Sequence, residues 1–153
     1  MELRYLNSED VVFYRKELNQ MLHFCMEASC PFPVEESFFE RKLNGLRDYL
    51  SQGKAYVIGA IEDGKLIGFY WIYELVEGVR RKMHVAYVAV MPEARGRGVC
   101  SMMEKEAQQK ARDLGIRVME MIVSTENLSV IEFRRQRHGY SVTNVIMEKE
   151  LSV

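Results

Sequence analysis

Apolar residues with helical spacing dominate the first third of the chain. Between residues 8 and 26 they fall on one face of a helix, at Val11, Tyr14, Leu18, Met21, Leu22 and Cys25. Residues 35–51 repeat the pattern, with Phe39, Leu43, Leu46 and Leu50 on one face. Pro31 and Pro33 lie between the two segments, and neither can continue a helix. The pattern therefore predicts two helices separated by a break at residues 28–33.

After residue 54 the pattern becomes that of strands. Residues 55–61 and 65–75 are rich in β-branched and aromatic side chains, and Asp63–Gly64 between them is typical of a hairpin turn. Residues 83–90 form a third apolar run, which ends at Met91–Pro92. The sequence therefore predicts three consecutive strands, of which the first two form a tight hairpin.

The last third of the chain alternates between the two element types. A helix is predicted at about 99–114, a strand at 118–124, a helix at 127–137 and a final strand at 140–151. A short first strand at 2–6 completes the order. This order predicts an α/β protein with a mixed, mostly antiparallel central sheet flanked by helices, and a single domain over residues 1–153.

Composition excludes several classes of protein. With 48% hydrophobic and 28% charged residues, the chain is neither disordered nor fibrous. No run approaches the ~18 apolar residues of a membrane span, and the N-terminal residues lack a signal-peptide core, so we expect a cytoplasmic protein without membrane association. The cysteines form no C-x-x-C element, which argues against a disulfide framework and against a metal site.

Charge argues against one further class. The net charge of −1 removes the basic footprint of a general nucleic-acid binder, although the basic clusters at residues 80–82 and 134–137 leave an RNA-associated protein as a distant alternative. The charge is uneven, at −4 over residues 1–76 and +3 over residues 77–153. This distribution favours an anionic ligand in the second half and a cationic one near the first.

The chemistry is concentrated in residues 88–111, where a strand leads into a loop with Gly96 and Gly98, and the loop leads directly into a helix. The first backbone N–H groups of a helix have no partner inside it, and the helix dipole adds partial positive charge. The glycines let this backbone approach a ligand closely, and Arg95 and Arg97 add positive charge. The pattern predicts a cradle for phosphate groups; the alternative is an ordinary turn with solvated arginines.

This stretch resembles the acetyl-CoA-binding motif of the GCN5-related N-acetyltransferase (GNAT) superfamily. The RGRGV of residues 95–99, preceded by the strand end at Val88–Pro92, is similar to a family loop that reads Arg/Gln-x-x-Gly-x-Gly/Ala. Asn127, Phe133 and residues 138–140 resemble the second conserved block of the family. The order of elements matches over nearly the whole chain.

Two positions depart from the family pattern. Cys100 replaces the final Gly or Ala of the loop and is still small. Arg134 and Arg135 stand where many relatives have a tyrosine that acts as general acid. An arginine does not give up its proton at workable pH, so the acid of this chain must lie elsewhere, or a fixed charge must suffice.

The resemblance implies an acetyl-CoA-dependent N-acetyltransferase with the acyl-CoA N-acyltransferase fold. The pyrophosphate would lie on the loop backbone at Arg95, Gly96, Arg97, Gly98, Val99, Cys100 and Ser101. The pantetheine arm would pair with Val88 and Val90 as an added strand, and a backbone N–H near Ala89 or Val90 would stabilise the oxyanion. Asn127 would bind the arm or a water on it, and Arg134 would bind a CoA phosphate or stabilise the thiolate.

The acceptor is expected to be a primary amine, on a small molecule or a peptide. Such an amine is mostly protonated at neutral pH, so a residue must accept its proton. Tyr87 and Glu74 are the expected catalytic residues, and one of them or a water chain would accept this proton; His84 and Glu120 are further candidates. Strict strand alternation places Tyr87 on the same face as Val85 and opposite His84. For each of these residues an ordinary role at the edge of the core is the alternative.

The function expected is transfer of an acetyl group from acetyl-CoA to the amine by direct attack in a ternary complex. A catalytically silent acyl-CoA-binding or regulatory domain of the same fold is the alternative. Glu27, Glu35 and Glu36 lie in the segment 27–38, where we expect a wall of the acceptor cleft that attracts a cationic amine. A homodimer, and a preference for another acyl-CoA, stay open.

Overall fold

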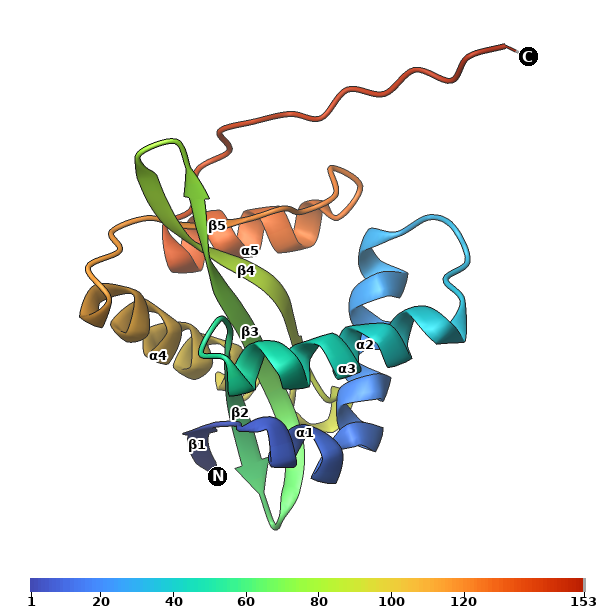
Figure 1. Cartoon of the computed structure of the whole chain (residues 1–153). Helices are drawn as coiled ribbons and strands as arrows, with labels where there is room; N and C mark the ends of the chain where they lie inside the picture. The colour runs from blue at the N-terminus through green and yellow to red at the C-terminus, as the bar shows by residue number, and fades with distance from the viewer. Residues whose placement is uncertain (153) are drawn as a thin grey trace. The chain divides into compact units, whose positions relative to one another are not determined.

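The computed structural model describes residues 1–152, which fall into two units, residues 1–122 and the residues from Val123 onward (Figure 1). The first unit holds a five-stranded sheet of order β1-β2-β3-β4-β5. The strands are β1 (Glu2–Tyr5), β2 (Tyr56–Glu62), β3 (Lys65–Glu77), β4 (Arg80–Val90) and β5 (Met119–Met121). Neighbours from β1 to β4 are antiparallel, and β5 pairs with β4 in parallel. The mixed, mostly antiparallel sheet predicted from the sequence is confirmed.

Three helices cover one face of the sheet (Figure 1). They are α1 (Ser8–Phe13), α2 (Arg15–Ser29) and α3 (Glu36–Ser51). Their apolar faces are buried as predicted, with Leu18 and Leu22 among the fully buried side chains. The helix predicted over residues 8–26 is broken at Tyr14, whose dihedral angles (φ −95°, ψ 21°) leave the helical region.

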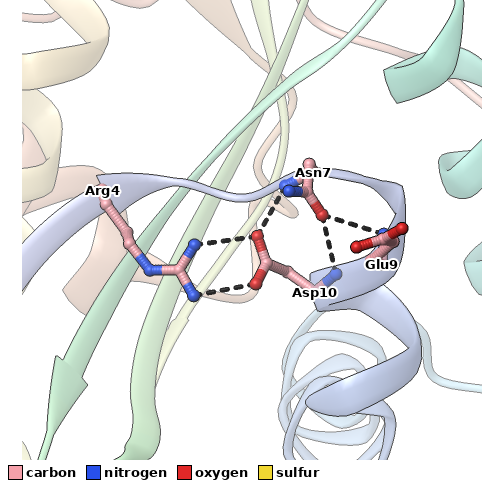
Figure 2. A network of polar contacts seen from close by, with 4 residues as sticks. All are labelled: Arg4, Asn7, Glu9 and Asp10. Carbon is pink, nitrogen blue, oxygen red and sulfur yellow. Dashed lines mark hydrogen bonds and ion pairs between the residues drawn. The ribbon is translucent and has the colours of Figure 1, made fainter.

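The connection from β1 to α1 is fixed by polar contacts (Figure 2). The Asn7 side chain accepts hydrogen bonds from the backbone N–H of Glu9 and Asp10, both at 2.9 Å, and the Asp10 carboxylate accepts from the Asn7 N–H at 2.9 Å. Arg4 donates to both oxygens of that carboxylate, at 2.9 and 2.8 Å. This capping box satisfies donors that the helix start leaves unpaired and ties the helix to the first strand.

The opposite face of the sheet is covered by α4 (Val99–Asp113), which follows the short 3₁₀ turn η1 (Pro92–Ala94). Met103 and Ala107 of α4 are fully buried there. The Tyr70 hydroxyl of β3 donates a hydrogen bond to the buried Glu104 carboxylate of α4. The helix thus packs against the sheet through both apolar and polar contacts.

A β-bulge in β4 changes which face of the sheet its later side chains point to. Trp71 of β3 pairs with Tyr87, but the next residue, Ile72, pairs with Val85, so Ala86 is an extra residue on β4. In consequence Tyr87 lies on the side of the first three helices, whereas Val85 packs with α4. The prediction that Tyr87 shares a face with Val85 was therefore wrong, because a bulge shifts the alternation of a strand by one position.

The second unit contains α5 (Leu128–His138), close to the predicted helix over residues 127–137. The strand predicted at 140–151 was wrong, because these residues form no strand in the structure. Their apolar residues, at positions 140, 142, 145–147 and 151, do not alternate regularly with polar ones, and Met147 is 91% exposed. Within residues 1–152, no helix combines the length and the apolar character needed to cross a bilayer.

Candidate functional site

One edge of β4 is uncovered near its end. The neighbouring strand β5 pairs only with Met83–Val85, whereas β4 continues to Val90. The N–H of Met91 donates to the Ile67 carbonyl of β3 at 2.8 Å, so strand alternation directs the backbone groups of Val88 and Val90 to the opposite, uncovered side. An extended ligand could add there as a strand.

Two side chains donate hydrogen bonds to the backbone carbonyls of this edge. The Cys25 thiol of α2 donates to the Val88 carbonyl at an S–O distance of 3.4 Å. The Nε of Arg95 donates to the Val90 carbonyl at 3.0 Å, and its guanidinium carbon lies 5.4 Å from the centre of the Phe24 ring. Burial raises the pKa of the Cys25 thiol to about 11, so this sulfur stays protonated and remains a donor.

The loop after β4 has the conformation that its glycines allow. Gly96 and Gly98 have φ angles of +76° and +78°, in the left-handed region. A Cβ at either position would meet no atom within 4 Å, so the space beside the loop is open. Gly98 is also the N-cap residue of α4, and no side chain caps this helix start. The positive end of the helix dipole therefore faces the open space, as an anion site requires.

The two arginines of the loop differ in their contacts. Arg97 forms a bidentate ion pair with Glu62 at the end of β2, with N–O distances of 3.0 and 2.6 Å. The Arg97 guanidinium lowers the pKa of the Glu62 carboxyl. This pair anchors the loop and balances the charge of Arg97, whereas Arg95 connects the loop to the strand edge. The charge expected of Arg97 is thus already matched within the protein.

The remaining residues expected to bind the cofactor lie in two places. Val99 is the first residue of α4 and is buried, and Cys100 and Ser101 are half-buried in the same first turn. Asn127 and Arg134 belong to the second unit. Asn127 stands at the N-cap position of α5 and accepts a hydrogen bond from the Ser129 hydroxyl at 3.3 Å. Arg134 is 4% exposed, and its Nη1 lies 2.8 Å from the His138 Nδ1.

A cavity of about 910 Å³ borders β4 on the side of α3. Its walls come from α3, from residues 53–56 before and within β2, and from β3 and β4. Both expected catalytic residues, Tyr87 and Glu74, line it, and so does His84. The bulge brings His84 and Tyr87 to this one cavity, although strict alternation predicted opposite faces.

Tyr87 and Glu74 have different acid–base character. Burial raises the pKa of the Tyr87 phenol, so Tyr87 keeps its proton at neutral pH and can donate it. Glu74 forms a bidentate pair with Arg81, at 2.5 and 3.1 Å, which lowers the pKa of this carboxyl and makes it a weaker base. Of the two, Tyr87 is placed as a proton donor to a neighbouring atom in the cavity.

His84 is held by a carboxylate. Its Nδ1 lies 3.1 Å from a carboxylate oxygen of Glu120, and the Lys82 ammonium lies 3.0 Å from the other oxygen and 2.7 Å from Glu77. Burial would raise the pKa of Glu120, but the hydrogen bonds from Lys82 and His84 outweigh it and lower that pKa. An ionised carboxylate accepts the Nδ1 proton and leaves Nε2 as the proton acceptor.

The pairing of His84 with Glu120 depends on the parallel register of β4 and β5, in which these residues are direct partners. The sequence offers both residues as candidates but does not show that they are paired.

The carboxylates of residues 27–38 do not line the cavity, although we expected this segment to form a wall of the acceptor cleft. Glu36 contacts His23 and Asn19 at 3.2 and 3.3 Å, and the cavity is lined by Phe38 rather than by the carboxylates of this segment.

Comparison with known proteins assigns this architecture. The sequence profile of the Acetyltransferase (GNAT) family matches residues 16–140, across both units. The chain belongs to this family. The family and the fold class predicted from the glycine loop and the order of elements are confirmed.

Individual GNAT relatives are distant in sequence. An uncharacterized N-acetyltransferase of Bacillus subtilis, YdgE, is 23% identical over 90 residues, which are 59% of this chain and 57% of that protein. A predicted acetyltransferase from Clostridium acetobutylicum, solved with acetyl-CoA, has a TM-score of 0.78 at 14% identity, and the alignment covers 97% of this chain and 95% of that chain. An aminoglycoside acetyltransferase from an uncultured soil metagenomic sample, in complex with sisomicin, has a TM-score of 0.73 at 16% identity, and the alignment covers 99% of this chain and 96% of that chain.

Proposed function

We propose that this protein transfers the acetyl group of acetyl-CoA to a primary amine, on a small molecule or a peptide, by direct attack in a ternary complex. The junction of β4 and α4 carries the proposal. There the strand edge at Val88 and Val90, which β5 does not cover, continues into a glycine loop and an uncapped helix start. A cavity that could hold the acceptor borders the same strand at Ala86 and Tyr87.

Acetyl-CoA fits the features of this junction. Its amide-containing arm would pair with Val88 and Val90, and an N–H of that arm would replace the Cys25 thiol at the Val88 carbonyl. Its pyrophosphate would lie against the loop backbone, where the open space beside both glycines leaves room. The residues proposed to contact it are Val88, Ala89, Val90, Arg95, Gly96, Arg97, Gly98, Val99, Cys100 and Ser101, with Asn127 and Arg134 from the second unit.

The strand edge also offers an oxyanion donor. Ala89 faces β3 by strand alternation, so its N–H belongs to the sheet, whereas the N–H of Val90 faces the uncovered side. We assign Val90 as the donor that stabilises the negative oxygen formed when the amine attacks the thioester carbonyl. A donor of this kind contributes about 3 kcal/mol to lowering such a barrier.

Side chains of the cavity can supply the proton acceptor and the proton donor that the reaction needs. The acceptor first releases one proton from its ammonium form to solvent, and the neutral amine loses a second proton as the C–N bond forms and the C–S bond breaks. His84 accepts that proton at Nε2, directly or through a water, and Glu120 holds the imidazole in position. Tyr87 donates its phenol proton to the leaving thiolate. Afterwards His84 releases its proton to solvent and Tyr87 regains one from solvent, which returns both residues to their starting states. Glu74 stays a second candidate acceptor, weakened by its pair with Arg81.

The test is turnover with purified protein. Acetyl-CoA is incubated with a panel of primary amines, and CoA release is followed with a chromogenic thiol reagent while mass spectrometry identifies the acetylated amine. We expect amine-dependent release, with a kcat about tenfold or more lower in Tyr87→Phe and an unchanged KM for acetyl-CoA. Binding of acetyl-CoA without amine-dependent release from any acceptor would instead support a silent acyl-CoA-binding domain.

We also propose that residues 1–153 act as one catalytic domain. The family match runs from residue 16 to residue 140 and so includes parts of both units. A protein ending at residue 122 would keep the strand edge, the loop and the cavity but lose Asn127 and Arg134. We expect this shortened protein to bind acetyl-CoA more weakly than the full chain, as measured by calorimetry.

A further inference from the structure

The charged side chains that line the cavity are mostly basic. Arg41 and Lys42 project from α3, and Lys54 lies just before β2. Within residues 1–152, Glu74 is the acidic residue that lines the cavity. Its negative charge is balanced by Arg81, with which it forms a bidentate ion pair. The cavity therefore has an excess of positive charge.

The three basic groups are not neutralised by other carboxylates. Within residues 1–152, Arg41, Lys42 and Lys54 form no ion pair. The Lys42 ammonium lies 5.4 Å from the centre of the Phe38 ring and 5.9 Å from that of Tyr87, next to the proposed proton donor. These ring contacts orient the ammonium but leave its charge unmatched. The positive potential of the cavity is thus available to a ligand.

The negative charge closest to the proposed base is also balanced. Glu120 sits behind His84 and is paired with Lys82, which also contacts Glu77. The acidic segment over residues 27–36 does not line the cavity. No carboxylate on the described walls is therefore left to hold a second ammonium group of an acceptor.

The rest of the lining is largely aromatic. The aromatic residues are Phe38, Tyr49, Tyr56, Trp71, Tyr73 and Tyr87. Trp71 is 5% exposed, and its buried indole N–H has no hydrogen-bond partner within residues 1–152. Such walls favour an acceptor with a flat, apolar body, and the indole N–H is a donor that an oxygen of this acceptor could satisfy after a small side-chain shift.

We infer that the acceptor is an aromatic primary amine that carries a carboxylate or phosphate at the end away from the amine. This inference rests on the proposed acetyltransferase function and names its substrate class. The basic side chains would bind the anionic group. The same positive potential favours loss of the proton from the acceptor amine, which attack on the thioester requires. An aminoglycoside, with its several ammonium groups, would meet like charges in this cavity.

A matched series of acceptors isolates the anionic group. Tyramine is compared with 4-(2-aminoethyl)benzoate and with O-phosphotyramine, which have the same aminoethyl arm and differ at the far end of the ring. The opposite charge is supplied by 4-(2-aminoethyl)phenyltrimethylammonium, which keeps the primary amine and carries the trimethylammonium group in place of the phenol hydroxyl. We expect kcat/KM to rise at least fivefold from tyramine to an anionic member and to fall for the cationic one. The carboxylate and phosphate arms show which anion is preferred.

Charge-removing variants test whether the cavity causes the preference. Lys42→Gln and Lys54→Gln should each reduce the kcat/KM ratio of anionic acceptor to tyramine about three- to fivefold. Arg47→Gln is the matched control, because Arg47 is exposed on α3 and does not line the cavity, and we expect it to leave the ratio unchanged. Equal or better turnover of the cationic acceptor, or a ratio insensitive to both lysine variants, would overturn the inference and leave the acetyltransferase function intact.

Absence of turnover with every amine would count against the proposed function instead. The inference is then decided by calorimetry of the same acceptors with the protein and CoA. Tighter binding of the anionic members that weakens in Lys42→Gln would support it. Equal binding of all members would overturn it.

Discussion

Replacement of Glu120 by Gln tests the assignment of His84 as the proton acceptor. The Glu120 carboxylate holds the imidazole at 3.1 Å and the Lys82 ammonium at 3.0 Å, while Lys82 keeps a second carboxylate at Glu77, 2.7 Å away. The substitution preserves size and leaves Lys82 paired. It removes the negative charge that fixes the Nδ1 proton and stabilises the imidazolium formed during the reaction.

The expected effect of Glu120→Gln is a fall in kcat of at least about tenfold, because it removes part of the roughly 10²- to 10⁴-fold contribution of general base catalysis. The KM for acetyl-CoA should stay constant, because Glu120 lies away from the loop. His84→Gln should lower kcat at least as much, and the double variant should be little worse than His84→Gln alone, since Glu120 acts through His84.

Steady-state kinetics of the two single variants and the double variant provide the measurement, with Glu77→Gln as the control that weakens Lys82 but leaves the His84 contact in place. Thermal unfolding shows that each variant is folded. Additive losses in the double variant, or a kcat unaffected by Glu120→Gln in a folded protein, would refute the reasoning that links the two residues.

Three further outcomes follow from the contacts described above. Arg4 lowers the pKa of Asp10 in the folded state, so Asp10→Asn should lower the free energy of unfolding by about 1 kcal/mol at pH 7. This difference should shrink below about pH 4, where Asp10 becomes protonated, and denaturant unfolding at several pH values measures it. The Cys25 thiol, with a pKa of about 11, should react with iodoacetamide at pH 8 about 100-fold more slowly in the folded protein than in denaturant. Gly98→Asp should weaken acetyl-CoA binding at least tenfold in calorimetry, whereas Gly78→Asp, also at positive φ but in the β3–β4 turn, should not.

The parts of the fold predicted from the sequence are those with a local cause. Asp63 and Gly64 both adopt positive φ in the turn between β2 and β3, as their residue types suggest, and Gly115 ends α4 with a φ of +72°. The helical spacing of apolar residues located the buried faces of α2 and α3. The break at Tyr14 was not anticipated, because no glycine or proline stands near it in the sequence. The final strand was predicted wrongly, because apolar residues do not show whether another strand is present to pair with them.

The candidate site divides in the same way. The glycine loop could be predicted, since it is a feature of a continuous stretch of chain, whereas the strand edge at Val88 and Val90 was expected only from the family resemblance. The ion pair of Arg97 with Glu62 joins residues far apart in sequence, and the pairing of His84 with Glu120 follows from strand register. The bulge at Ala86 decides which side chains enter the cavity, and no local pattern marks it. The sequence therefore indicated the glycine loop better than it indicated which side chains meet in the cavity.

CoA release in the presence and absence of an amine decides whether this protein transfers an acetyl group. Purified protein is mixed with acetyl-CoA alone and then with each member of the aminoethyl series, and the acetylated product is identified by mass. We expect release that requires the amine, matches the amount of N-acetylated product and is strongly reduced in Gly98→Asp but not in Gly78→Asp. Acetyl-CoA binding with no amine-dependent release across cationic, neutral and anionic acceptors would contradict the proposed function.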